Sequence, residues 1–287
     1  MYNDLIYLYM KAFMTLLLAL ITGACSNSNS APATTTAGII AEQLLSGEDI
    51  ALQQSQPVSL AIAIVNDISG SYRLNPESFD LNVLYQAFPA CKGRIVIGYT
   101  LITEDSYTPI LRYSYTPFIP LIPQESIQQD VKEARRDNPW IQREKKTNND
   151  PRNDIQRANH HIDSLNSVID SLNRISFASF SSKIDDKLNR PIARRSDVIG
   201  ALRRASTFLG EFDDCPRILM VCSDFKDNIN NNQSMTLDTA ITLFIVGSNV
   251  DPKDVKSATG MEKSGYRLFE SYEEALNQMI RKYMYNP

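Results

Sequence analysis

Three oxygen-bearing side chains stand on alternate residues directly after an apolar stretch of the chain. Asp67, Ser69 and Ser71 form the pattern Asp-x-Ser-x-Ser, and the apolar residues 58–65 precede them. Alternate residues of a turn can direct their side chains to one point, as the ligands of calcium-binding loops do. Carboxylate and hydroxyl oxygens suit Mg²⁺ or another hard divalent cation, whereas Zn²⁺ favours His and Cys. The pattern therefore predicts a metal-binding turn.

Two further oxygen-bearing residues extend this set. Asp224 follows the apolar stretch 217–222, and Ser196 stands just before a helical pattern. In open α/β sheets, ligands gather at the carboxyl ends of strands, where the winding of the sheet reverses. Taken singly, a serine in this position is also a typical helix N-cap, and aspartates are typical of turns that follow strands. The ordered set favours a metal site shared with Asp67 over these separate structural roles.

Strand and helix patterns alternate along the chain, as an α/β fold requires. Residues 58–65 are rich in β-branched side chains, which is typical of a strand buried on both faces. Residues 110–115 alternate between apolar and polar side chains, so they predict an antiparallel partner at the sheet edge. The other strands are expected at 94–102, 217–222, 243–246 and 266–269, and helices at 78–88, 197–209 and 273–283. This order predicts a doubly wound, mainly parallel sheet.

A long insertion interrupts the alternation at about residues 117–190. Pro117, Pro120 and Pro123 forbid regular strand pairing, and a polar, charged stretch follows them. Residues 154–175 then carry apolar side chains at alternating spacings of three and four, which is typical of a helix seam. Because the seam is short, we expect a helix that packs on the domain rather than a coiled coil.

The order of the oxygen-bearing residues resembles the metal-ion-dependent adhesion site of the von Willebrand factor A family. That family uses Asp-x-Ser-x-Ser, then a Thr, then an Asp, in this chain order. The resemblance places Ser196 at the Thr position, where the hydroxyl is kept, and Asp224 at the last position. It implies a von Willebrand factor A or Rossmann-like domain that binds Mg²⁺, or Mn²⁺ or Ca²⁺, and leaves one coordination position open to a partner's carboxylate. Phe225 stands where the family often has Gly.

The N-terminal residues resemble a bacterial lipoprotein signal. Lys11 precedes a short apolar run at 12–21, and Thr22 and two small residues lead to Cys25. A membrane-spanning helix needs about 20 apolar residues, whereas a positive residue, a short apolar run and small residues before a cleavage point are typical of a secretory signal. The residues before Cys25 resemble a lipobox, with Thr22 where Leu is usual. The resemblance implies cleavage before Cys25 and diacylglycerol on its sulfur.

These features predict how the chain is organised. We expect translation to begin at Met10, because residues 1–9 contain an Asp and no positive charge. Small polar residues and prolines after the lipidated cysteine predict a flexible tether. The expected regions are a signal peptide at 1–24, the lipidated cysteine and tether at 25–56, and the folded domain at 57–285 with its insertion at about 117–190.

The remaining cysteines leave one pairing open. Apart from Cys25, the chain contains Cys91, Cys215 and Cys222, and this odd number argues against a disulfide framework. Cys222 lies within an apolar strand pattern, which is typical of a core residue. Cys91 and Cys215 each precede a predicted strand, so a disulfide between them at one edge of the sheet stays open in an oxidising compartment.

Composition limits the partners and the chemistry. The 287 residues carry a formal net charge of −4 at pH 7, so the chain lacks the basic surplus that binds nucleic-acid phosphates. His160 and His161 are the only histidines, and adjacent residues on a helix point apart. The sequence places no Cys/His pair for nucleophilic catalysis and contains no Gly-rich phosphate loop. We therefore expect no enzyme and no nucleic-acid partner.

The sequence as a whole predicts a metal-dependent binding module anchored at the bacterial cell envelope. Its partner is expected to be a protein or peptide that offers an acidic side chain, and its only membrane contact is the lipid anchor. Ser26 stands where an Asp marks inner-membrane retention in some proteobacteria, so the outer membrane is favoured over other envelope sites. The alternative is a structural or assembly lipoprotein whose metal site is empty and whose insertion helix contacts the partners.

Overall fold

The computed structural model describes most of the folded domain. Cys25, Ser71 and the predicted signal peptide lie outside the described residues. So does the predicted tether up to residue 48. The described residues are 49–69, 72, 80–104, 109–123, 151–189, 191–227, 229 and 234–285.

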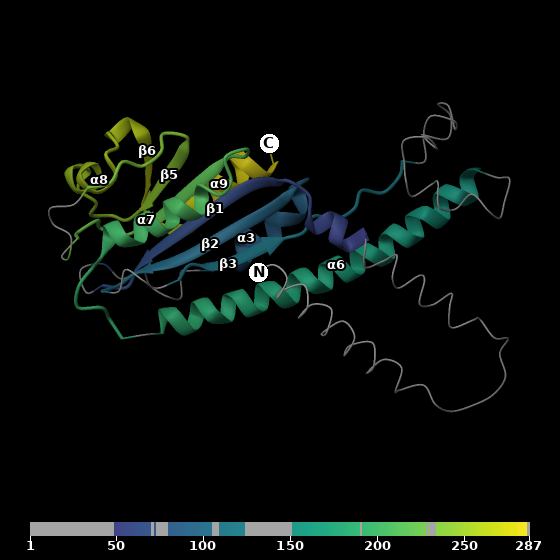
Figure 1. The fold of residues 1–287 in the computed structure, drawn as a ribbon, viewed down its shortest axis with the longest axis horizontal. Coiled ribbons are helices and arrows are strands. Elements are labelled where there is room, and N and C mark those ends of the chain that lie inside the picture. The colour runs from purple at the N-terminus through teal and green to yellow at the C-terminus, as the bar shows by residue number, and fades with distance from the viewer. Residues whose placement is uncertain are drawn as a thin grey trace. The chain divides into compact units, whose positions relative to one another are not determined.

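A six-stranded sheet forms the centre of the domain (Figure 1), with the strand order β3-β2-β1-β4-β5-β6. Every neighbouring pair is parallel except β2 and β3. The expected doubly wound sheet with one antiparallel edge strand is therefore confirmed, and its strand order is that of a Rossmann-like fold. The strands are β1 (Val58–Asp67), β2 (Arg94–Ile102), β3 (Leu111–Tyr115), β4 (Arg217–Cys222), β5 (Ile241–Val246) and β6 (Tyr266–Phe269).

The winding of the sheet reverses between β1 and β4. From β1 the chain adds β2 and β3 on one side, and it then crosses over to add β4, β5 and β6 on the other. The register pairs Asn66 of β1 with Cys222 of β4. The next residues along the chain, Asp67 at the end of β1 and Ser223 just after β4, therefore lie side by side at the reversal point, where α/β sheets bind their ligands.

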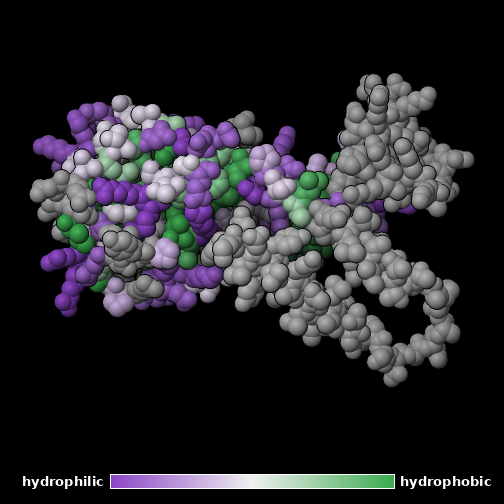
Figure 2. All heavy atoms as spheres, viewed as in Figure 1, coloured by the Kyte–Doolittle hydropathy of each residue, from purple (hydrophilic) through white to green (hydrophobic). Residues whose placement is uncertain are grey.

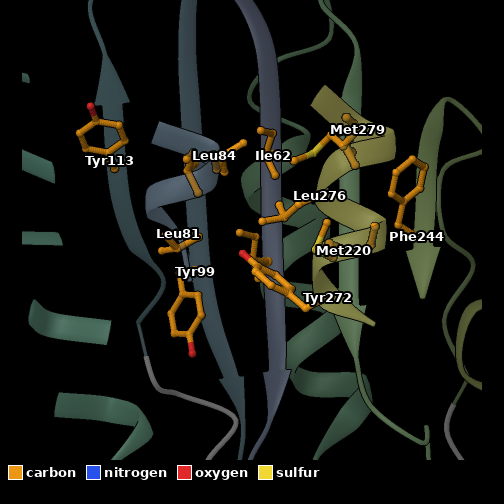
Figure 3. Close-up of a cluster of buried hydrophobic side chains, with 14 of the residues drawn as sticks. Ile62, Leu81, Leu84, Tyr99, Tyr113, Met220, Phe244, Tyr272, Leu276 and Met279 are labelled. Carbon is orange, nitrogen blue, oxygen red and sulfur yellow. The ribbon is translucent and has the colours of Figure 1, made fainter. Parts of the chain in front are cut away.

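Helices cover both faces of the sheet. On one face, Ile62 of β1, Met220 of β4 and Leu276 of α9 belong to one buried cluster (Figure 3). On the other face, the small residues Ala61 and Ala63 of β1 pack in a second cluster with α7 and α8. The helices of the first face are α3 (Asn82–Ala87), α9 (Tyr272–Ile280) and the C-terminal part of α6 (Pro151–Leu188), and those of the second are α7 (Val198–Leu209) and α8 (Pro252–Thr259).

Several boundaries differ from the sequence analysis. The predicted tether is wrong over residues 49–54, which form a helix. Ile50 of this helix packs in a third buried cluster with Ile119 and with residues of α6, so tertiary contacts order it. Helix α8 was not predicted, because it contributes only a few buried residues. Its ends nevertheless carry ordinary signals, with Asp251 as N-cap and Gly260 in a left-handed C-cap.

The insertion helix packs on the domain as expected, and it is longer than the predicted range 154–175. Helix α6 runs over Pro151–Leu188. Its first half packs in the third cluster, and Phe177, Phe180 and Ile184 of its second half join the core beneath β3. The second stripe of apolar residues therefore continues the helix past the predicted end.

Three asparagines of α6 bind the proline-rich segment that follows β3. The side-chain amide of Asn173 accepts from the N–H of Thr116 at 3.0 Å and donates to its carbonyl at 2.8 Å. Asn166 binds Ile119 through the same two bonds, and Asn159 binds Ile122. Each amide thus replaces the partner strand that the prolines forbid.

We call these three pairs of hydrogen bonds the asparagine ladder, and the spacing of the residues on its two sides explains why it is regular. The asparagines recur every seven residues of a helix, which corresponds to about 10.5 Å. Their partners recur every three residues, which corresponds to about 9.3 Å in a polyproline II conformation. Pro117, Pro120 and Pro123 each follow a bound residue, and a proline holds the residue before it in extended conformations.

The two cysteines that were left open as a pair lie on opposite faces of the sheet. Cys91 packs in the cluster of the first face, and Cys215 packs against the cluster of the second. Both are free thiols. The sheet itself therefore separates them.

Within the described part of the chain, no helix combines the length and the apolar character needed to cross a membrane. On the face drawn in Figure 2, the described elements present mainly hydrophilic residues, with hydrophobic ones in narrow strips between them. Most large apolar side chains lie in the three buried clusters instead.

The ladder makes a stability prediction. We expect Asn173→Ala to lower the free energy of unfolding by about 1–3 kcal/mol, because it leaves a buried N–H and a buried carbonyl of Thr116 without partners. Urea denaturation measures the change. Ser171→Ala, on the exposed side of the same helix, is the control and should stay within about 0.5 kcal/mol of the parent. Equal stability of the two variants would contradict a structural role for the ladder.

Candidate metal centre

Asp67 ends the central strand β1 with its carboxylate buried. Only 1% of the residue is exposed. One carboxylate oxygen accepts from the Ser69 N–H at 2.8 Å, and the other accepts from the Ser223 hydroxyl at 2.7 Å. Burial raises the pKa of the Asp67 carboxyl, the hydrogen bonds from Ser69 and Ser223 lower it in part, and the charge of Asp224 raises it further. The carboxylate is therefore held in place in an environment that favours a neighbouring cation.

Asp224 lies one residue beyond the serine that binds Asp67. It is also buried, with 3% of the residue exposed. Its Oδ1 accepts from the backbone N–H of Lys226 at 3.1 Å. Its Oδ2 lies 3.5 Å from the Lys226 ammonium and has no hydrogen-bond partner. The two predicted carboxylates thus come from neighbouring loops at the reversal point of the sheet.

Ser196 lies in the loop before α7 with its side chain fully buried and its hydroxyl without a hydrogen-bond partner. The N-cap of α7 is Asp197, whose carboxylate accepts from the Gly200 N–H at 2.8 Å. The alternative reading of Ser196 as a helix N-cap is therefore wrong. Asp197 is the better cap at this position, and the serine is left for another role.

Backbone contacts fix the Ser196 loop against the ends of two strands. The Ala193 N–H donates to the Ile68 carbonyl at 3.2 Å, and Ala193 also forms an isolated bridge with Ser69. On the other side of Ser196, the Asp197 N–H donates to the Thr103 carbonyl just after β2. The loop thus crosses the carboxyl ends of β1 and β2.

A third contact joins the loop after β4 to α7. The Asp227 carboxylate accepts from the Ile199 N–H at 3.0 Å, in the first turn of the helix. Helix N-termini favour such negative groups because their first N–H groups lack partners within the helix. The loops that carry the candidate ligands follow β1, precede α7 and follow β4. The Ser223–Asp67 bond, the Ala193–Ile68 bond and this contact join the three loops to one another.

Phe225 has a backbone φ of 63°, the positive value that glycine adopts readily. For other residues the left-handed conformation costs about 1–2 kcal/mol. The Phe225 ring is buried in the cluster beside α7, and the N–H of this residue donates to the Ser223 hydroxyl at 2.9 Å. The turn after β4 therefore adopts a left-handed backbone without a glycine.

Tyr72 is a residue of this region that the sequence analysis missed. Its hydroxyl donates to the carbonyl of Val246 at the end of β5, at 3.0 Å. Burial raises the pKa of Tyr72 above its ordinary value, and the charges of the Asp67 and Asp224 carboxylates raise it further. The Tyr72 side chain therefore reaches the end of β5, which lies beyond β4 from β1, and it is near the two aspartates.

The donor atoms fit a hard divalent cation. Buried polar atoms without partners cost about 1–3 kcal/mol each, and two of them, the Ser196 hydroxyl and Asp224 Oδ2, belong to the predicted set. Among the described residues there is no group of three or more His, Cys, Asp and Glu side chains that could hold a metal. The described candidates are two carboxylates with neutral hydroxyls, the kind of donors that Mg²⁺ takes.

Of the five predicted residues, Asp67, Ser69, Ser196 and Asp224 lie at one edge of the sheet, and Ser71 falls outside the described residues. Ser223, Asp227 and Lys226 were not among the predicted residues. The only local signal for these three was their position just after a buried strand.

No protein-family model matches the chain, and no curated protein matches it. Among solved structures, it is similar to proximal thread matrix protein 1 from the mussel byssus, with a TM-score of 0.35, 10% identity and 80% of this chain against 46% of the other. A structure of that protein with a zinc-occupied MIDAS motif gives a TM-score of 0.37, 10% identity and the same coverage.

The pilus adhesin SpaC from Lactobacillus rhamnosus GG gives a TM-score of 0.36 at 10% identity, over 79% of this chain and 31% of the adhesin. The chain thus spans less than half the length of each of these structures. Values this low transfer no residue roles to this chain.

The capping of α7 yields a paired prediction. A Cβ at Gly200 would lie 2.1 Å from Asp197 Oδ2, so Gly200→Ala must displace the cap. Loss of the cap costs about 1 kcal/mol, and we expect a net loss of stability although alanine favours helices. At Gly210 the φ is −67° and the nearest atom to a Cβ is 3.4 Å away, so Gly210→Ala should be neutral or stabilising. Thermal melts compare the pair, and a Gly200→Ala protein as stable as the parent would refute the cap.

Proposed function

We propose that the domain is a metal-dependent binding module of the von Willebrand factor A type. One observation carries this proposal: three loops are tied together around buried oxygens, and two of these oxygens have no hydrogen-bond partner. Atoms of this kind are costly unless something binds them. A divalent cation can coordinate carboxylate and hydroxyl oxygens at the same time.

The proposed ligands are Asp67, Ser69, Ser71, Ser196 and Asp224, and the proposed ion is Mg²⁺, with Mn²⁺ or Ca²⁺ as substitutes. When bound, such an ion supplies a positive charge, and one of its coordination positions stays exchangeable so that an incoming carboxylate can bind there. Ser223 orients Asp67 through its hydroxyl. Because three of the proposed ligands are neutral hydroxyls, the ion keeps part of its charge for an acidic side chain of a protein or peptide partner. The proposal assigns no catalytic residue.

We further propose that lipidated Cys25 anchors the module at the bacterial cell envelope, with the outer membrane favoured. The support is the signal pattern that ends at this cysteine. The helix over 49–54 belongs to the folded domain, so the tether shortens to residues 25–48. A short tether of this kind holds the binding site within reach of the envelope and of other proteins anchored there.

Metal binding should stabilise the folded protein. A ligand at a hundred times its dissociation constant contributes about 2.7 kcal/mol, so saturating Mg²⁺ should raise the Tm by several degrees over protein in chelator. Asp67→Asn, which keeps the size of the side chain and removes its charge, should abolish this rise. Asp163→Asn on the exposed face of α6 is the matched control and should keep it. A Tm that ignores Mg²⁺, or an Asp67→Asn protein that still responds, would refute the proposal.

The alternative function has an observation of its own. Val168, Leu172 and Ile175 form an apolar stripe on the exposed side of α6, with 44%, 40% and 69% of each residue exposed. A partner that covers this stripe would bind without metal. Deletion of α6 cannot test this, because the helix contributes Phe177 and Phe180 to the core.

A pull-down from envelope extract separates the two functions. For the metal-dependent module, chelator should remove the retained partner and the change of Val168, Leu172 and Ile175 to serine should leave it bound. Retention that survives chelator and disappears with the triple serine variant would favour the helix-mediated alternative. Both measurements use the full chain after its signal, immobilised through the C-terminus.

A further inference from the structure

Lys226 faces both oxygens of one proposed metal ligand. Its backbone N–H binds Asp224 Oδ1 at 3.1 Å, and its ammonium lies 3.5 Å from Oδ2. The side chain of Asp224 is 4% exposed, whereas that of Lys226 is 55% exposed. A buried carboxylate therefore has a cation beside it that reaches in from solvent.

The same turn fixes Lys226 and the other proposed ligands. The left-handed backbone at Phe225 brings the Lys226 N–H back to the Asp224 carboxylate. The Phe225 N–H in turn binds the Ser223 hydroxyl, which donates to Asp67. The position of Lys226 is thus set by the loop that holds the site and not by an independent surface contact.

The Lys226 ammonium balances part of the negative charge of the buried carboxylates. Asp67 and Asp224 are both buried at adjacent strand ends, and two carboxylates in such a place repel each other. Burial of an uncompensated charge is costly, so a metal-free site gains from a nearby ammonium. Among the described ion pairs, Lys226 is the basic residue that faces Asp224.

The ion pair between Lys226 and Asp224 can also be broken at little cost. An exposed lysine regains water and side-chain freedom when it leaves, so such pairs contribute little net stability. A divalent cation carries twice the charge and binds the oxygens directly. We propose that Lys226 is a built-in counter-ion, which neutralises Asp224 while the site is free of metal and is displaced when the cation binds. The inference rests on the proposed metal-binding function and adds a competitor to it.

Removal of the ammonium should have opposite effects on the two states of the protein. Lys226→Met keeps most of the length of the side chain without its charge. In chelator this variant should melt below the parent protein, and saturating Mg²⁺ should close the gap. Its dissociation constant for Mg²⁺, measured by calorimetry, should fall about three- to ten-fold because nothing competes for Asp224.

Two further variants make the result specific. Lys226→Arg keeps the charge and should restore the behaviour of the parent protein. Lys253→Met, an exposed lysine at the start of α8, should change neither the melting temperature nor the affinity.

Equal Mg²⁺ affinity of the parent protein and Lys226→Met would overturn the counter-ion inference and leave the metal site standing. Weaker binding by Lys226→Met would overturn it as well, because the lysine would then support the cation. If the parent protein itself binds no Mg²⁺, the proposed function fails and this inference fails with it.

Discussion

The hydrogen bond from the Ser223 hydroxyl to the Asp67 carboxylate is the contact on which the site depends. It joins the ends of β1 and β4 at the point where the winding of the sheet reverses, and the register of the two strands brings these residues together. It orients Asp67, and the same serine oxygen accepts from the Phe225 N–H, which sets the turn that carries Asp224. One hydroxyl thereby couples two buried carboxylates.

Most of the fold could be predicted because strands buried on both faces have simple sequences. The predicted ranges of β2, β4 and β6 agree with the structure. The end of β1 could not be predicted, because Asn66 and Asp67 are polar and their burial comes from neighbouring elements. The helix over 49–54 and the asparagine ladder were missed for the same reason: each is ordered by contacts with α6, which lies far along the chain.

The candidate site divides along the same line. Asp67, Ser196 and Asp224 could be found from their order and from their places after strands and before a helix. Asp197 as the N-cap in place of Ser196, and Asp227 as a second acceptor for α7, depend on which N–H groups the folded loops present. Residues that position others across loops leave no pattern in a single sequence, so sequence reasoning identifies donors better than it identifies what holds them.

The distribution of costly features indicates where the domain does its work. The prolines at the start of the insertion block strand pairing, yet the asparagine side chains of α6 provide hydrogen bonds to the backbone of this proline-rich segment. At the carboxyl edge of β1 and β4, by contrast, buried carboxylates, a left-handed phenylalanine and a buried hydroxyl without a partner occur together. Elsewhere, the hydroxyls of Tyr113 and Tyr115 in β3 and the Nε of Arg94 in β2 are also buried without a hydrogen-bond partner, but these residues lie in ordinary strand backbone. Selection for stability alone would remove such a combination, because each feature lowers the stability of the folded protein. Its persistence at the one place where α/β sheets bind ligands favours a site that a cation completes.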